Sequence, residues 1–205
     1  TTKPEIAELY YDMGKLYFLM GKSASGKDTL YKMILKERPE LIPYVGFTTR
    51  PMRAGEQEGK EYHFTGVGDL RRFEASGKLI EKRVYHTVYG DWYYYSVDTA
   101  EVNLAEHSYL YIGTLESFVK IRDYYGADKV IPIYVEVEDG LRLSRALERE
   151  RAQEKPGYAE MCRRFLTDSE DFSEEKLRLA GIEKRFENID INDCLSKILS
   201  ETIDL

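Results

Sequence analysis

The sequence predicts an α/β domain built on a mostly parallel central sheet with helices on both faces. Two features of the chain support this prediction. Apolar runs of strand length alternate with segments of helical periodicity, which is typical of parallel sheets. A glycine-rich loop also joins the first apolar run to the first helical segment. The length of 205 residues suits one such domain with small insertions.

The first part of the chain contains two expected strands and a helix. The apolar run 15–20 indicates a buried strand that leads into the glycine-rich loop. Residues 27–38 have apolar side chains on one helical face, and Pro39 ends that helix. A second, short strand is expected over 43–47.

The middle of the chain is expected to be less regular. Residues 48–66 are polar and rich in glycine and arginine, so we expect a loop with extended pieces. A helix over 69–76 should stop at Gly77. Aromatic residues crowd the stretch 85–95, and a hairpin that packs them on alternate faces is the plain structural interpretation.

Two further strands are expected over 109–112 and 130–137. Pro132 has no N–H to donate to a neighbouring strand. We therefore expect the second of these strands at an edge of the sheet, or with a strained start.

The last part of the chain is expected to be mainly helical. A charged helix over 140–153 should turn Leu143 and Leu147 inward, and Pro156 and Gly157 should break it. The remaining expected elements are two helices, a short strand and a closing helix, over 158–166, 173–180, 185–189 and 191–203.

Composition excludes several classes of protein. No apolar run approaches the ~20 residues that a membrane span needs. The net charge of −7 argues against a nucleic-acid groove. Residues 1–8 have no secretory pattern, and the distant Cys162 and Cys194 suit reduced thiols. We expect a cytoplasmic protein, monomer or homodimer, without a nucleic-acid or membrane partner.

Residues 21–27 match the phosphate-loop pattern G-x-x-x-x-G-K, with a strand before and a helix after. Backbone N–H groups at the helix start can wrap phosphate oxygens, and Lys27 can reach the β and γ phosphates. Asp28 stands where a hydroxyl residue is usual and Thr29 follows, so either can hold Mg²⁺. The alternative is a glycine-rich helix cap that binds nothing. The expected phosphate-binding residues are Gly21, Lys22, Ser23, Ala24, Ser25, Gly26, Lys27, Asp28 and Thr29.

A second motif lies in residues 48–64, T-T-R-P-M-R-A-G-E-Q-E-G-K-E-Y-H-F. Arg50 and Arg53 can fork onto one phosphate monoester, and Tyr62 adds a hydroxyl donor. A solvated basic loop is the alternative. The stretch resembles the guanylate kinase signature T-T-R-x-P-R-x-G-E-x-x-G-x-D-Y-x-F, with the proline moved by one and Glu61 at the acidic position.

The resemblance covers most of the chain in order and weakens after Glu81. It implies a three-layer P-loop kinase fold with a small acceptor-binding region and a helical lid. It also implies ATP as phosphoryl donor with Mg²⁺, and GMP as acceptor. Arg50, Arg53 and Tyr62 would hold the acceptor phosphate, and Glu81 would accept from guanine N1–H and the 2-amino group.

The sequence departs from this family in the expected base pocket. Gly46 stands where family members usually have a serine near guanine O6. Residues 89–96 look expanded relative to the family pattern G-x-Y-Y-G-[ST]. One alignment uses Tyr89, and the other uses Tyr94 and Ser96. We favour the second for GMP binding because it keeps a hydroxyl.

A second departure concerns the acidic residues of the family pattern D-x-D-x-Q-G. Tyr111 and Gly113 occupy these acidic positions. On charge and location alone, Asp28 or Glu116 can take over the metal role.

Arginines after residue 140 resemble the family's lid. Arg145 and Arg149 match the run L-x-x-R-L-x-x-R, and Arg164 stands where a later lid arginine is usual. Together with Lys27 they are the expected catalytic residues, since phosphoryl transfer needs cations around the moving group. A salt-bridged, solvated helix is the alternative. Asn188 is expected beside the donor adenine.

We therefore expect one domain over 1–205, with an acceptor-binding region over about 48–100 and a lid over about 145–168. The core segments are about 15–47, 105–140 and 182–205. Three hypotheses follow: a kinase acting on GMP, a kinase of the same fold acting on another nucleoside monophosphate, and a binding module that has lost catalysis. The missing strand-end acids favour the third, whereas Lys27 and the lid arginines disfavour it.

Overall fold

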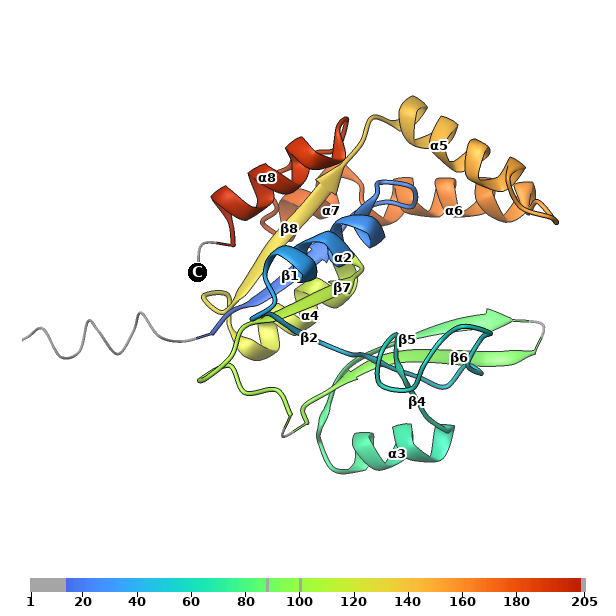
Figure 1. The fold of residues 1–205 in the computed structure, drawn as a ribbon. Coiled ribbons are helices and arrows are strands. Elements are labelled where there is room, and N and C mark those ends of the chain that lie inside the picture. Colours follow the sequence, from blue (N-terminus) through green and yellow to red (C-terminus); the bar gives the residue numbers. More distant parts are fainter. Residues whose placement is uncertain (1–13, 88, 100, 204–205) are drawn as a thin grey trace, which may run out of the picture.

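The centre of the molecule is a five-stranded parallel sheet with the strand order β2-β7-β1-β8-β9 (Figure 1). The computed structural model describes residues 14–87, 89–99 and 101–203, so the polar stretch 1–8 lies outside the described residues. The strands are β1 (Leu16–Met20), β2 (Ile42–Pro43), β7 (Tyr109–Gly113), β8 (Val130–Glu136) and β9 (Phe186–Glu187).

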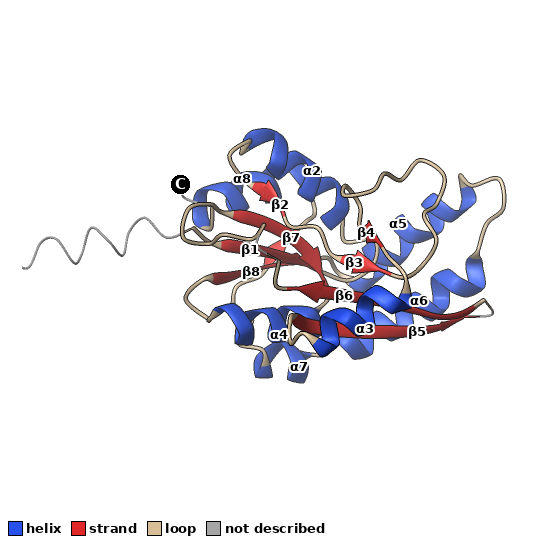
Figure 2. Cartoon of the chain, turned by 90° about the horizontal axis from the view of Figure 1, so that it is seen from below, coloured by secondary structure: helices blue, strands red, loops and turns tan. Residues whose placement is uncertain are grey.

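Both faces of this sheet are covered, because β1 is buried along its whole length. Leu16 and Phe18 pack into one apolar cluster with α4 (Leu115–Tyr125) and α7 (Glu174–Leu179). Tyr17 and Leu19 face the other cluster, against α2 (Lys27–Glu37) and α8 (Ile191–Glu201). Figure 2 shows the resulting three layers from below.

A second sheet stands beside the first, with the strand order β4-β3-β6-β5. Its long members, β5 (Leu79–Thr87) and β6 (Gly90–Val97), form an antiparallel hairpin. The short strands β3 (Phe47–Thr48) and β4 (His63–Phe64) complete it, and α3 (Val67–Ala75) covers one face through the cluster around Leu70, Tyr95 and Val97.

Two contacting helices, α5 (Asp139–Arg151) and α6 (Tyr158–Asp171), form an arm on the side of the molecule where the hairpin also projects (Figure 1). None of the helices in the described ranges is long and apolar enough to cross a membrane. The α/β fold class with a mostly parallel central sheet is therefore confirmed.

Most expected elements are present, but three expectations are wrong. The strand over 43–47 is two short pieces in different sheets, β2 and β3, because the chain leaves the central sheet at this point. The strand with Pro132 is internal, although β9 pairs only with its residues Val135 and Glu136 and does not reach the proline.

The third error concerns α5, where Leu143 is 38% exposed instead of buried. The buried side chains of this helix are Arg142 and Ala146. The apolar spacing suggested the wrong face because an arginine, held by carboxylates, occupies the inward position.

Candidate active site

The phosphate loop joins β1 to α2 at the carboxyl edge of the central sheet. Its last glycine, Gly26, has φ +85°, and Ala24 has φ +61°, so the chain turns through left-handed backbone twice. Gly21 is also required, since a Cβ there would stand 2.6 Å from the Val135 carbonyl oxygen. The first amides of α2 have no acceptor within the helix and are available to an anion.

Lys27 and its neighbours stand at the start of α2. The Lys27 ammonium lies 3.7 Å from the carboxylate of Asp28, and its side chain is 18% exposed. Asp28 itself is 82% exposed, and Thr29 is exposed as well. The first three residues of α2 therefore offer one cation, one carboxylate and one hydroxyl beside the free amides.

Asn188 supports the phosphate loop from below. It is 2% exposed, and its side-chain amide donates to the Ser25 carbonyl oxygen at 2.8 Å. A Cβ on Gly26 would come within 2.4 Å of that amide nitrogen. Arg145 in turn donates to the carbonyl oxygens of Asn188 and Ile189 at 2.9 and 3.0 Å. Asn188 thus holds the phosphate loop, and Arg145 holds the segment that carries Asn188.

Arg142, on the buried face of α5, connects the arm to the phosphate loop. The side chain is 1% exposed and pairs with Asp139 at 3.0 Å and Asp168 at 3.3 Å. It also donates to the Ser23 carbonyl oxygen, while the Ser23 amide donates to Asp168 at 2.7 Å. Its guanidinium lies over the ring of Phe165.

Two other arm arginines, Arg149 and Arg164, share a small cavity with Ser23 of the phosphate loop. Both side chains are exposed, and neither forms an ion pair within 4 Å in the described part of the chain. By contrast, Arg163 is paired with Glu160. Arg149 and Arg164 are therefore cations close to the loop without a direct ion pair. The hydrogen bond from Arg163, and after it the nearby charge of Arg164, lower the pKa of Glu160.

The acceptor-side residues meet on the face of the second sheet that α3 does not cover. Arg50 is 4% exposed and donates to the Tyr94 hydroxyl oxygen at 3.1 Å. Its guanidinium lies 5.3 Å from the ring centres of both Tyr62 and Phe64. The structure thus brings Arg50, Tyr62 and Tyr94 together, whereas Tyr89 is 84% exposed near the hairpin tip.

Arg50 already has an anionic partner. Glu56 accepts from both terminal nitrogens of the guanidinium, at 2.5 and 2.7 Å, and also from the Arg53 amide. The hydrogen bonds from Arg50 lower the pKa of Glu56 to about 2 and raise the pKa of Arg50. A carboxylate thus occupies the fork of Arg50, and the exposed side chain of Arg53 lies outside that pair.

Further along the same face lies Glu81, whose side chain is fully buried. It accepts from Ser96 at 3.1 Å and from Arg83 at 3.2 Å. The Ser96 oxygen lies 3.1 Å from the Tyr111 hydroxyl. The structure therefore joins two expected residues, Glu81 and Ser96, to two that were not expected at the site.

The departures from the family pattern fit this packing. The Tyr111 hydroxyl would stand 3.2 Å from a Cβ on Gly46, so it fills the space of a side chain there. A Cβ on Gly113 would come within 2.6 Å of the Phe18 ring, which packs edge-on against Tyr111. Aromatic rings therefore occupy the region where the family pattern has strand-end acids.

The described residues include no group of three acidic, histidine or cysteine side chains that could cage a metal ion. Glu116, in the first turn of α4, is 61% exposed and pairs with Lys120 at 2.9 Å. The cysteines are free thiols, Cys162 exposed and Cys194 buried.

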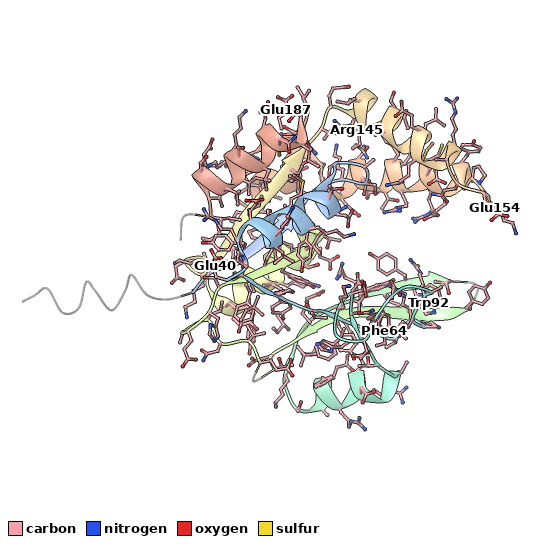
Figure 3. All side chains as sticks on the ribbon, in the orientation of Figure 1. Glu40, Phe64, Trp92, Arg145, Glu154 and Glu187 are labelled. Carbon is pink, nitrogen blue, oxygen red and sulfur yellow. The ribbon has the colours of Figure 1, made fainter. Side chains whose placement is uncertain are left out.

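One strand of the hairpin, β5, borders a cavity. A cavity of about 770 Å³ is lined by residues of β5, of α4 and of the α6–α7 region, including Arg83, Tyr85, Glu116 and Asp171. Figure 3 labels Phe64 and Trp92 on the second sheet and Arg145 and Glu154 on the arm, on the same side of the molecule. The cavity thus lies between β5 of the hairpin and helices α4 and α7, and the arm contributes only Asp171 at the end of α6.

A glycine-rich loop with a lysine on a parallel sheet, an adjoining arginine-bearing arm and a separate small sheet together define a P-loop kinase fold. The family model described as Guanylate kinase matches residues 13–112. Over these residues the chain is similar to guanylate kinases.

Individual guanylate kinases are similar to this chain along most of its length. A guanylate kinase of Dechloromonas aromatica is 27% identical over 195 residues, which is 92% of this chain and 86% of the relative. One of Rhodococcus jostii is 40% identical over 73 residues, 36% of this chain and 35% of the relative. The crystal structure of guanylate kinase from Anaplasma phagocytophilum has the same fold, with TM-score 0.61 and 21% identity over 92% of this chain and 84% of that chain.

Sequence reasoning missed four residues of the site: Glu56, Arg83, Arg142 and Asp168. Arg83 could have been found, because strand side chains alternate and it shares a face with Glu81. The other three act through contacts between distant segments, or within an irregular loop, for which the sequence has no periodic signal.

Proposed function

We propose that this protein transfers the γ-phosphoryl group of ATP to GMP, giving ADP and GDP. The observation that carries the proposal is the Arg50–Tyr62–Tyr94 cluster, on the uncovered face of the second sheet. It stands in a chain that also has an intact phosphate loop and is similar to guanylate kinases along most of its length.

On the donor side, the amides at the start of α2 and Lys27 would bind the β and γ phosphates of ATP. Asn188 and Arg145 would hold the loop in shape, since they contact backbone around it. On this proposal Asn188 supports the donor site from beneath, because its side chain is buried against the loop.

On the acceptor side, the phosphate of GMP would replace Glu56 as the partner of Arg50. A phosphate monoester offers the guanidinium fork the same bidentate geometry as a carboxylate, with more negative charge. Arg53 and Tyr62 would add donors to the same phosphate. Without GMP, the Glu56 carboxylate then occupies the position of the acceptor phosphate and keeps the Arg50 guanidinium oriented.

During transfer, Arg149 and Arg164 would surround the moving phosphoryl group. Neither forms an ion pair within 4 Å in the described part of the chain, and both line a cavity with Ser23, so they can turn toward the γ phosphate without breaking such a pair. No general base is required, because the acceptor phosphate is already ionised. Catalysis then rests on positioning and on charge stabilisation.

The residues present fit a Mg²⁺ ion that arrives with ATP. Such an ion takes one or two protein oxygens and completes its shell with phosphate oxygens and water. Asp28 and Thr29 offer a carboxylate and a hydroxyl at the loop, and Glu116 offers a further carboxylate on α4. When bound, the metal would neutralise charge on the β and γ phosphates.

We also propose that residues 1–205 act as one domain, with an acceptor-binding region over about 48–100 and a lid over about 145–168. A cytoplasmic location and a monomer or homodimer remain predictions.

The test is a coupled ADP-release assay with ATP, Mg²⁺ and each of GMP, dGMP, AMP, UMP and CMP. We expect rapid release with GMP and a loss of about 10²-fold or more in Lys27→Ala, because a transition-state charge contact is removed. Lys36→Ala, at the far end of α2, is the matched control and should retain the rate. Preference for another monophosphate would contradict GMP as the acceptor, and no release with any of them would contradict catalysis.

A further inference from the structure

The carboxylate expected to read the acceptor base is covered in this structure. The side chain of Glu81 is 0% exposed, whereas that of Arg83, two residues along β5, is 15% exposed. Residues two apart on a strand share a face, so both point toward the acceptor side of the sheet. The group that meets an incoming ligand is therefore the guanidinium rather than the carboxylate.

Hydrogen bonds engage both oxygens of Glu81 inside the sheet. One accepts from Ser96 and the other from Arg83. Since the Ser96 proton points to Glu81, the Tyr111 hydroxyl must donate to Ser96 at 3.1 Å. Burial raises the pKa of Tyr111 to about 12, which keeps this donor protonated. The chain Tyr111–Ser96–Glu81 thus ends on Arg83.

Arg83 has donors to spare at the cavity. Its Nε contacts Glu81, and one Nη1 hydrogen points to Thr114 at a long 3.4 Å. Its Nη2 forms no hydrogen bond to any side chain or carbonyl group among the described residues. The side chain lines the cavity of about 770 Å³ between the hairpin and α4. The Arg83 guanidinium, held by its ion pair with Glu81, thus presents N–H groups to that cavity.

A guanidinium and a carboxylate read different edges of a purine. A carboxylate accepts from guanine N1–H and the 2-amino group. A guanidinium donates to O6 and N7, and it disfavours adenine, whose 6-amino group is itself a donor. Hypoxanthine has the same O6 and N7 as guanine but no 2-amino group, so it separates the two modes.

We propose that Arg83, held by Glu81, determines base specificity by donating to the 6-oxo edge of the acceptor purine. The inference rests on the proposed function, in that the acceptor is a 6-oxopurine monophosphate. Glu81 is then a positioning residue that acts through Arg83, with Ser96 and Tyr111 fixing its orientation.

The experiment compares GMP, IMP and AMP, first as acceptors in the ADP-release assay and then as ligands in calorimetric titrations without ATP. For the unchanged chain we expect kcat/KM and affinity for GMP and IMP to agree within about threefold. AMP should be about 10- to 100-fold weaker, the discrimination that one bidentate arginine contact provides.

Arg83→Ala uncovers Glu81 and reverses the pattern. The GMP-to-IMP ratio should rise to about tenfold or more, because the carboxylate can then meet the 2-amino group. Arg83→Lys should lose discrimination against AMP, since an ammonium has no fork. Lys82→Ala removes a neighbouring cation, paired with Glu74 of α3, and should leave every ratio unchanged.

A preference for GMP over IMP of tenfold or more in the unchanged chain would overturn the proposal, whether or not the Arg83 variants fold. Equal binding of GMP and IMP without ADP release would support the role of Arg83 and contradict the proposed phosphoryl transfer. ADP release with GMP, but weak binding of IMP, would uphold the transfer and overturn the role of Arg83.

Discussion

At the scale of residues, the departures from the family pattern are linked in pairs. Gly46 leaves the space that the Tyr111 hydroxyl fills, and Gly113 leaves the space that the Phe18 ring fills. Each glycine is therefore matched to an aromatic side chain on the neighbouring surface. The three positions at which the sequence departs from the family pattern therefore lie in one packed region.

Because the Phe18 ring packs against Gly113, adding a methyl group at this position should destabilise the protein. Gly113→Ala places a Cβ 2.6 Å from the Phe18 ring and should cost about 1–3 kcal/mol of unfolding free energy. The matched control is Gly68→Ala in α3, where nothing lies within 4 Å, which should stabilise by about 0.5–1 kcal/mol. Urea denaturation measures both. Equal effects at the two positions would contradict the packing argument.

The residues of the site were predictable where a motif fixes the backbone. The phosphate loop lies where its glycines and the following helix require it. The occupation of Arg50 by Glu56 was not predictable, because it depends on how an irregular loop folds back on itself. The sequence also could not predict that Arg83 is more exposed than Glu81. It could predict that the two side chains share a face of the strand, because they are two residues apart.

At the scale of elements, α5 shows why apolar spacing alone misjudges a face. The helix packs on α6 and on the phosphate loop, and its inward side chain is an arginine that two carboxylates and a carbonyl group satisfy. Leu143 is left partly exposed as a consequence. Hydrophobic periodicity finds a helix reliably, but it cannot see an ion-paired side chain as buried.

Arg142→Ala should therefore destabilise the protein by about 3 kcal/mol or more, because it leaves the carboxylate of Asp168 without its partner. It should also raise the KM for ATP, since the Ser23 carbonyl oxygen loses the hydrogen bond from Arg142 and only the hydrogen bond from the Ser23 amide to Asp168 remains. Arg151→Ala, on the exposed end of the same helix, should change stability by no more than about 0.5 kcal/mol. Thermal denaturation of the two variants measures the difference, and similar melting temperatures would show that the arm is not anchored through Arg142.

At the scale of the whole molecule, the order of strands and helices was predictable because buried strands are continuous apolar runs and helices carry capping and breaking residues. The separation of β2 and β3 into two sheets was not, because the apolar stretch gives no sign of where the chain leaves the core. On the proposed function, the phosphate loop, the second sheet and the arm would each supply a different part of the charge that phosphoryl transfer needs.

In the proposed reaction, the phosphate loop, the second sheet and the arm act on one phosphoryl group. The most direct measurement is transfer of label from ATP labelled at the γ position to GMP, with ADP and labelled GDP quantified together. Labelled GDP should form in a one-to-one ratio with ADP, and Arg149→Ala and Arg164→Ala should each slow its formation by about 10²-fold or more. Release of ADP and free phosphate without labelled GDP, or no turnover while nucleotides still bind, would contradict it.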